Sequence, residues 1–259
     1  MKLSVAATAP FGADVLERLA ARHEIAFLLT RPDKRAGRGR KPTPPPAKAS
    51  AERLGIPVLD DLHAPLPAET IVVVAYGVIV TSDLLDRHLW LNVHPSLLPR
   101  WRGAAPVERA IMAGDQETGV TIIRLVEELD AGPIAAQRAF AIGPEDDAGA
   151  VYVKAAETAV ELLDEVLTGP TFTQQAEEGV TYAAKLTAAD RELDWTRPAA
   201  ELERQVRALS PHIGARAELD GRRVTIWRAR VEARKLVPLE VQPEGRRRMS
   251  YDEFLRGLR

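Results

Sequence analysis

The sequence contains no cysteine. This absence excludes disulfide bonds, thiolate metal ligands and cysteine nucleophiles. The sequence also has no apolar run long enough to cross a membrane. Its first residues continue directly into a strand pattern instead of a signal peptide. We therefore expect a cytoplasmic protein. With 46% hydrophobic and 28% charged residues among 259, the composition is that of an ordinary globular chain, long enough for two domains.

A glycine-rich phosphate-binding turn is missing as well. The first predicted strand is followed by Thr-Ala-Pro-Phe-Gly at residues 8–12. This turn lacks the glycine spacing that lets a backbone approach a pyrophosphate. The sequence therefore argues against a nicotinamide dinucleotide as cofactor.

Short β-branched and apolar runs alternate with helical patterns over the first two thirds of the chain. This alternation favours an α/β fold, with a Rossmann-like, mostly parallel sheet and helices on both faces. The predicted strands are residues 3–8, 24–30, 70–75, 89–94, 119–125 and 133–140, and the predicted helices are 13–21, 82–88, 106–113 and 147–167.

The pattern weakens between residues 168 and 181, where Gly, Pro, Thr, Gln and Glu predominate. A helix over 198–209 and strands over 216–219, 222–230 and 235–241 follow, with a hairpin signal at Asp220-Gly221. We expect a catalytic domain over 1–170, a linker over 171–195 and a second domain over 196–259. The second domain would be a helix with a small, arginine-rich sheet or barrel.

The net charge of −2 conceals two positive regions. Residues 181–259 carry 17 Lys and Arg against 12 Asp and Glu, and residues 31–48 carry seven cations against Asp33 alone. Such segregation is expected of a protein that binds a polyanion, although solvated basic surfaces produce the same pattern.

Asn92 and His94 lie two residues apart at the end of a predicted strand, so their side chains project from one face. Together with Asp130 they suit acyl transfer to an amine. An amide N–H and an imidazolium can stabilise the charge that develops on a carbonyl oxygen, and a carboxylate can orient the imidazole and accept the amine proton.

Two other interpretations of these residues are weaker. Ser96 lacks the strand, Gly-x-Ser-x-Gly turn and helix that expose a hydrolase nucleophile. His94 and Asp130 lack a second histidine at metal-ligand spacing, so we expect no metal site.

The motif Asn92-x-His94-x-Ser96-Leu97-Leu98-Pro99, with the later Leu129-Asp130-x-Gly132, resembles the signature of formyltransferases that use 10-formyltetrahydrofolate. The resemblance covers nearly the whole chain. It implies that Asn92, His94 and Asp130 are catalytic. It also implies that folate is contacted by the loop Ser96, Leu97, Leu98 and Pro99 and by Ala75, Tyr76 and Gly77.

Residues outside the triad resemble the branch of this family that formylates methionyl-tRNA. They lie at 100–106 and 114–121 and in the basic segment 31–41. The resemblance implies that initiator methionyl-tRNA is a partner of a monomeric enzyme supporting translation initiation. It also implies a second domain that is an OB-like barrel, here shortened after Val231. The implied tRNA contacts are Arg35, Arg38, Arg40 and Lys41.

Two alternatives remain open at this point. A formyltransferase acting on an amino-sugar nucleotide would share the triad, but its substrate gives less reason for the basic segment. A catalytically idle tRNA-binding protein could keep the fold, although the intact triad argues against it.

Overall fold

The computed structural model describes residues 2–36, 41–67 and 69–258. The chain divides into two compact units. The first comprises Met1–Arg102, Gly119–Ala139 and Val153–Thr181, and the second comprises Gly103–Thr118, Phe140–Tyr152 and Tyr182–Arg259. None of the helices in the described ranges combines the length and apolar character needed to cross a membrane.

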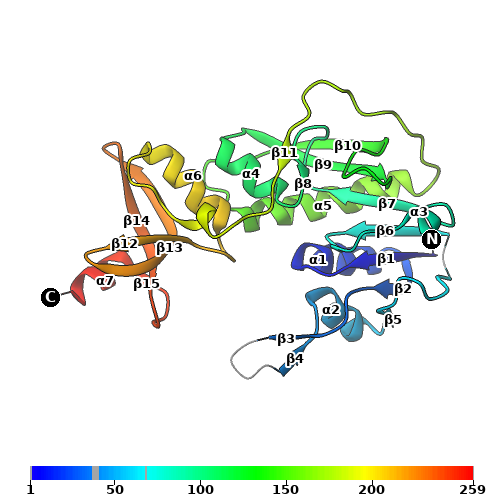
Figure 1. Ribbon diagram of the computed structural model, residues 1–259, viewed down its shortest axis with the longest axis horizontal. Coiled ribbons are helices and arrows are strands. Elements are labelled where there is room, and N and C mark those ends of the chain that lie inside the picture. Colours follow the sequence, from blue (N-terminus) through cyan, green and yellow to red (C-terminus); the bar gives the residue numbers. More distant parts are fainter. Residues whose placement is uncertain (1, 37–40, 68, 259) are drawn as a thin grey trace. The chain divides into compact units, whose positions relative to one another are not determined.

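The first unit is built on a sheet of seven strands: β1 (Lys2–Ala7), β2 (Glu24–Leu29), β5 (Val58–Leu59), β6 (Thr70–Val74), β7 (Leu89–His94), β9 (Glu117–Arg124) and β10 (Ile134–Ala141). Their order is β10-β9-β7-β6-β1-β2-β5 (Figure 1). From β7 to β5 the neighbouring strands pair in parallel, and β9 pairs antiparallel with β7. The predicted mostly parallel sheet is confirmed.

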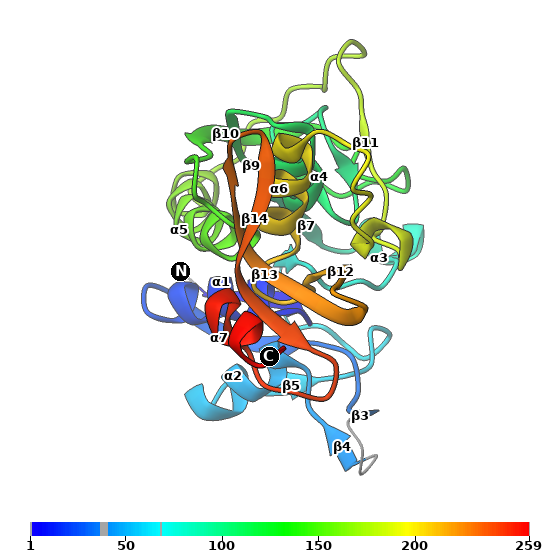
Figure 2. The same ribbon diagram turned by 90° about the vertical axis from the view of Figure 1, so that its left-hand side faces the viewer.

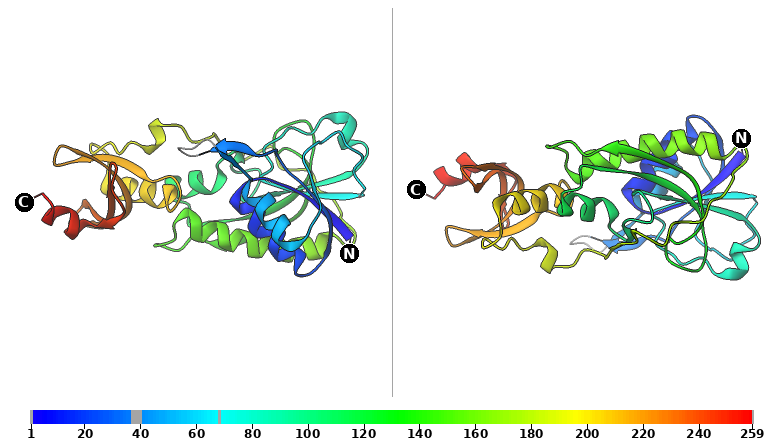
Figure 3. Two further views of the ribbon diagram at one scale, coloured as in Figure 1. Left: turned by 90° about the horizontal axis from the view of Figure 1, so that it is seen from below. Right: turned by 90° about the horizontal axis from the view of Figure 1, so that it is seen from above.

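Helices cover the sheet on both sides. The helices α1 (Pro10–Ala20), α2 (Pro46–Leu54) and α5 (Ala148–Val166) lie along one face (Figure 3). Arg18 of α1 reaches Glu157 of α5 at 3.4 Å. The other face carries α3 (Ser82–Leu85), which is shorter than the predicted helix over 82–88. It ends early because Leu89 already donates its backbone N–H to the Glu69 carbonyl as β7 begins.

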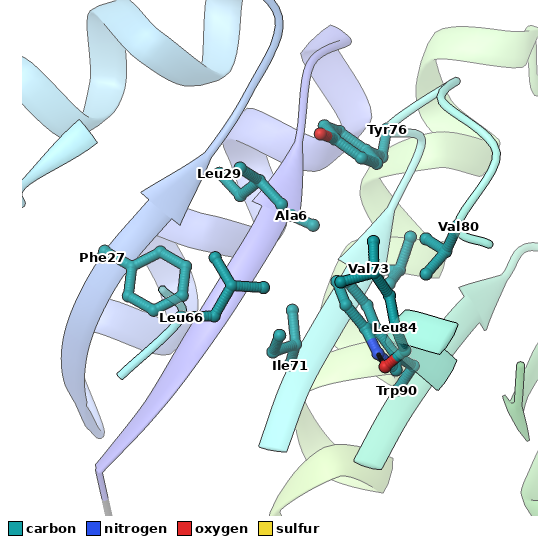
Figure 4. Close-up of a cluster of buried hydrophobic side chains, with 10 residues drawn as sticks. All are labelled: Ala6, Phe27, Leu29, Leu66, Ile71, Val73, Tyr76, Val80, Leu84 and Trp90. Carbon is teal, nitrogen blue, oxygen red and sulfur yellow. Dashed lines mark hydrogen bonds between the residues drawn. The ribbon is translucent and has the colours of Figure 1, made fainter. Parts of the chain in front are cut away.

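A cluster of buried side chains lies on this face of the sheet and includes Leu84 of α3 (Figure 4). Phe27, Ile71 and Val73 contribute from alternate strand positions, as period-two patterning requires. Trp90 is 1% exposed, and its indole N–H donates to the Leu84 carbonyl at 2.9 Å. This contact anchors the beginning of β7, the strand that carries two of the predicted catalytic residues.

Two small sheets accompany the large one. The basic segment forms a hairpin of β3 (Lys34–Ala36) and β4 (Lys41–Thr43), in which Lys34 pairs with Thr43 and Ala36 pairs with Lys41. The second small sheet joins β8 (Arg102–Gly103) and β11 (Tyr182–Ala183).

The second unit contains α4 (Pro106–Ala113), the 3-10 helix η1 (Ala189–Arg191), α6 (Ala199–Leu209) and α7 (Tyr251–Arg256). Its sheet consists of β12 (Ala215–Leu219), β13 (Arg222–Glu232), β14 (Lys235–Pro243) and β15 (Met249–Ser250). The long β13 and β14 dominate this sheet, and α6 packs against both (Figure 2). The predicted smaller β domain is confirmed. Within the described residues its sheet is open, with β12 and β15 at the edges.

Two tight turns shape this second sheet. Asp220 and Gly221 have φ of 49° and 71° and join β12 to β13, as the Asp-Gly signal predicts. Ala233 and Arg234 have φ of 47° and 62° and join β13 directly to β14. The second turn accounts for the shortened second domain after Val231. The chain reverses there at once and continues in the neighbouring strand β14.

Candidate active site

β7 places Asn92 and His94 on the same face of the sheet as the buried Trp90. β7 lies between β6 and β9, and Asn92 is level with Val73 on one side and Ile123 on the other. His94, at the carboxyl end of the strand, is 4% exposed. Ligands of open α/β sheets bind beyond this edge. The predicted pairing of an amide and an imidazole on one face is therefore present in the structure.

Asp130 joins them from the loop between β9 and β10. Its carboxylate accepts a hydrogen bond from Asn92 Nδ2 at 3.3 Å, and its second oxygen lies 3.6 Å from His94 Nδ1. The Asp130 side chain is 10% exposed. The structure thus brings together all three residues that the sequence predicts to be catalytic.

The other ring nitrogen of His94 is held by backbone. Nε2 lies 2.8 Å from the carbonyl oxygen of Trp101. A carbonyl oxygen only accepts, so Nε2 carries a proton and Nδ1 is the atom that faces Asp130. Trp101 itself has φ of 64°, and its N–H donates to the Thr181 hydroxyl at 2.9 Å.

The turn that carries Asp130 depends on glycine. Asp130 has φ of 50°, in the left-handed region, and two residues later a Cβ atom at Gly132 would overlap the carbonyl oxygen of Arg124. Any larger residue at Gly132 would displace this turn. The Asp-x-Gly spacing therefore has a steric reason in addition to a chemical one.

The predicted folate loop follows β7 and is tied to its neighbours. The Ser96 hydroxyl donates to the Arg100 carbonyl at 2.7 Å, and Ser96 has no exposed surface. The Leu98 N–H donates to the Thr121 hydroxyl at 3.1 Å. Leu98 is buried, whereas Leu97 and Pro99 are partly exposed. The Ser96 hydroxyl is thus engaged in closing the loop, which gives no support to its role as a nucleophile.

The other predicted folate segment follows β6 at the same edge of the sheet. Ala75 and Gly77 are exposed and have φ of 46° and 68°, and the buried Tyr76 lies between them. The Tyr76 carbonyl accepts from the Thr8 hydroxyl at 2.9 Å. Burial raises the pKa of the Tyr76 phenol, so this hydroxyl stays neutral. Because β6 and β7 are adjacent and parallel, both loops emerge at one edge.

The predicted tRNA-contacting residues are described only in part. Arg35 and Lys41 lie in the paired strands β3 and β4. Arg38 and Arg40 lie outside the described residues. The base of the hairpin is held by Lys48, whose ammonium lies 2.5 Å from the Asp33 carboxylate.

Two groups at this site have no signal in the sequence. The Trp101 carbonyl is a backbone atom, and no residue pattern announces it. Gln175 lies in a stretch that reads as a linker, and its side chain reaches the Asp130 turn together with that of Arg102.

Across the described part of the chain, no three His, Asp or Glu side chains gather closely enough to hold a metal ion.

Known proteins match this chain along its length. A family model described as formyl transferase matches residues 1–167, and one for the C-terminal domain of formyl transferases matches residues 185–237. The methionyl-tRNA formyltransferase of Paracoccus denitrificans is 41% identical over 292 residues, covering 100% of this chain and 98% of the relative. That of Cutibacterium acnes is 45% identical over 260 residues, covering 93% of this chain and 82% of the relative.

Solved structures share the fold at much lower identity. The methionyl-tRNA formyltransferase from Clostridium thermocellum superimposes with a TM-score of 0.66 at 15% identity, covering 94% of this chain and 98% of that one. An N-formyltransferase from Helicobacter canadensis, in complex with folinic acid and dTDP-3-aminofucose, gives 0.68 at 17%, covering 90% of this chain and 88% of that one. The matched models and the full-length relatives show that this chain belongs to the formyl transferase family.

Proposed function

We propose that this chain transfers a formyl group from 10-formyltetrahydrofolate to the α-amino group of methionine on initiator methionyl-tRNA. The observation that carries the proposal is the 41% identity to a methionyl-tRNA formyltransferase over the whole of this chain. In contrast, the likeness to the N-formyltransferase from Helicobacter canadensis, solved with dTDP-3-aminofucose, rests on fold, at 17% identity. The activity would support translation initiation in the cytoplasm, and we expect a monomer.

The loops beyond β6 and β7 suit a folate. Ala75 and Gly77 expose backbone at the carboxyl edge of the sheet, and Ile79, which is 86% exposed, adds an apolar side chain next to them. Exposed peptide groups beside an apolar surface match a flat heterocycle with amide-like edges. Ala75, Tyr76, Gly77 and the loop Ser96, Leu97, Leu98 and Pro99 would hold the donor. When bound, the folate supplies an activated formyl carbon.

Asn92 and His94 would stabilise the charge that develops on the formyl oxygen as the methionine amine attacks. The Asn92 amide has two N–H groups, and only one is needed for its contact with Asp130. The protonated imidazole would donate from Nδ1, because Nε2 is engaged with the Trp101 carbonyl. Both donors lie on rigid strand β7, so little reorganisation accompanies the reaction.

Asp130 would move the proton. Its carboxylate accepts the proton that leaves the attacking nitrogen as the new carbon–nitrogen bond forms. The same proton is then returned to the folate nitrogen as the bond between that nitrogen and the formyl carbon breaks. The products are formylmethionyl-tRNA and tetrahydrofolate, and atoms and charge balance without a covalent enzyme intermediate.

The basic hairpin and the second domain would bind the tRNA. Arg35 and Lys41 lie on paired strands whose register brings the two arms together, and Arg38 and Arg40 belong to the same basic segment. Cations of this kind neutralise phosphates without base specificity. We assign catalysis to residues 1–170 and further phosphate contacts to residues 196–259, with residues 171–195 as the linker between them.

Formyl transfer to charged initiator tRNA, beside an amino-sugar nucleotide as alternative acceptor, tests this function. We expect transfer to the tRNA alone, with a KM that rises steeply with salt because phosphates are neutralised on binding. Transfer to the sugar nucleotide alone would overturn the proposal in favour of a sugar N-formyltransferase. Salt-dependent tRNA binding without consumption of the formyl donor would instead indicate a catalytically idle binding protein.

A further inference from the structure

The segment over residues 173–181 is fixed at both ends by backbone hydrogen bonds. Thr173 and Ile134 exchange two of them, at 2.7 and 2.9 Å. At the other end, the Thr181 carbonyl accepts from the Arg102 N–H at 2.9 Å, and its hydroxyl accepts from the Trp101 N–H. Gln175 lies between these two anchor points. Its position relative to Asp130 is therefore determined by pairing on both sides.

The Gln175 amide joins Asp130 to a buried cation. Its Nε2 donates to the Asp130 carbonyl at 2.7 Å and to the Gly132 carbonyl at 2.8 Å. Its Oε1 accepts from Nε and a terminal nitrogen of Arg102 at 3.1 and 2.8 Å. A guanidinium only donates and a carbonyl only accepts, so these four contacts fix which end of the amide is which.

Arg102 holds the other side of the same turn. It is 8% exposed, and its remaining terminal nitrogen lies 3.6 Å from the Glu128 carboxylate. The turn from Glu128 to Gly132 is thus bracketed by Gln175 and Arg102. Within it Asp130 adopts a left-handed backbone conformation, which aspartate tolerates better than most residues but which still costs free energy. Contacts from the surrounding structure have to maintain that conformation.

We infer that Gln175 is a positioning residue for the reaction: its amide, oriented by Arg102, fixes the backbone of Asp130 so that the carboxylate stays against Asn92 and His94. The inference rests on the proposed role of Asp130 in formyl transfer. Gln175 touches neither substrate in this scheme. Its loss is therefore expected to lower kcat while KM for tRNA and folate changes little, since a misplacement of about 1 Å lowers turnover by up to about a hundredfold.

Two substitutions at Gln175 separate the hydrogen bonds from the bulk of the side chain. Gln175→Met keeps length and removes all four contacts. Gln175→Glu keeps an acceptor for Arg102 but offers no N–H to the Asp130 and Gly132 carbonyls. We expect both variants to lose kcat by about ten- to a hundredfold. Gln174→Met is the matched control, because Gln174 is the exposed neighbouring residue, and it should retain wild-type kcat.

A double-mutant cycle shows whether Gln175 acts through Asp130. In an Asp130→Asn background, Gln175→Met should lower kcat by less than about twofold, because the group that it positions is already disabled. Equal fold losses in the two backgrounds would overturn the inference. So would wild-type kcat in Gln175→Met.

An NMR measurement keeps the inference testable independently of the reaction. The His94 ring signals, assigned with a His94→Gln variant, should shift in Gln175→Met and not in Gln174→Met, because the Asp130 carboxylate leaves the imidazole. Unchanged ring signals in folded Gln175→Met would overturn the inference, even if the wild-type enzyme had no formyltransferase activity. Absence of activity with shifted ring signals would overturn the proposed function alone.

Discussion

The Nε2 atom of His94 lies 2.8 Å from the carbonyl oxygen of Trp101, and this contact decides which ring nitrogen is available for chemistry. Nδ1 alone faces the Asp130 carboxylate, at 3.6 Å. At this separation the two groups attract each other without a formed hydrogen bond. The Nδ1–H therefore stays available for the formyl oxygen in the proposed reaction, with the Asp130 carboxylate beside it.

Replacement of Asp130 by Asn tests the proton acceptor. The amide keeps the shape of the carboxylate but cannot take a proton from an amine, so we expect kcat to fall by more than about tenfold. KM for methionyl-tRNA should change little. Steady-state kinetics of formyl transfer measure both. Asp86→Asn, at an exposed position after α3, serves as control and should behave like the wild type. Turnover within twofold of wild type in Asp130→Asn would contradict the assignment.

Because of the basic hairpin, we expect the affinity for methionyl-tRNA to depend on salt. Replacing Arg35 and Lys41 together by Ala removes two cations from β3 and β4. We expect KM for methionyl-tRNA to rise, and the slope of log affinity against log salt to become shallower by about 1 to 2. Formyl transfer at saturating tRNA should keep its kcat.

Lys2→Ala provides the charge control for that experiment. Lys2 begins β1, at the amino end of the strand, where it pairs with the exposed Glu24 at 3.1 Å. Its removal should leave both the tRNA KM and the salt slope unchanged. Equal effects of Lys2→Ala and the double variant would mean that only net charge matters, and not the hairpin.

The carboxylate of Asp190 should make the free energy of unfolding depend on pH in acid. The Arg109 guanidinium, which donates to this carboxylate at 2.6 Å, and the Thr187 N–H lower the pKa of Asp190 from 3.8 to about 2. A depressed carboxyl pKa stabilises the fold above the unfolded-state pKa, and this stabilisation is lost as the pH falls through the folded-state pKa. The loss therefore occurs between about pH 4 and 2.

The corresponding variant is Asp190→Asn. We expect it to lower the free energy of unfolding by about 2 kcal/mol at pH 7, since a difference of one pKa unit corresponds to about 1.4 kcal/mol. The difference from wild type should shrink as the pH approaches about 2. Urea unfolding at several pH values measures it. A difference that stays constant with pH would mean that packing, and not the charge, is responsible.

The sequence predicts those parts of the site that depend on local geometry. The positions of Asn92 and His94 follow from the two-residue period of a strand, and the Asp-Gly turn at 220 and 221 follows from the φ values that it requires. Helix α2 is not among the predicted helices, because four prolines stand at residues 42–46, although Pro46 stands where a helix tolerates it, in the first turn.

Contacts between segments that are distant in the sequence cannot be predicted from such local patterns. Gln175 meets the Asp130 turn because its segment is anchored at Thr173 and at Thr181, and the pairing of Thr173 with Ile134 joins segments that show no common period. The orientation of His94 depends on a backbone carbonyl, that of Trp101, which would look the same whatever residue stood there. The family resemblance supplies catalytic residues, but the groups that position them become visible only in three dimensions.

The turn between β13 and β14 offers a way to stabilise the second unit. Ala233 and Arg234 both adopt left-handed conformations there, each costing about 1–2 kcal/mol for an ordinary residue. Ala233→Asn with Arg234→Gly would place Asn-Gly, the pair preferred in such two-residue turns. We expect the free energy of unfolding to rise by about 1 kcal/mol, measured by urea unfolding, with formyl transfer unchanged. Ala217→Gly, in the middle of β12, should instead destabilise the sheet. A destabilised Asn-Gly variant would show that the turn is not left-handed at these two residues.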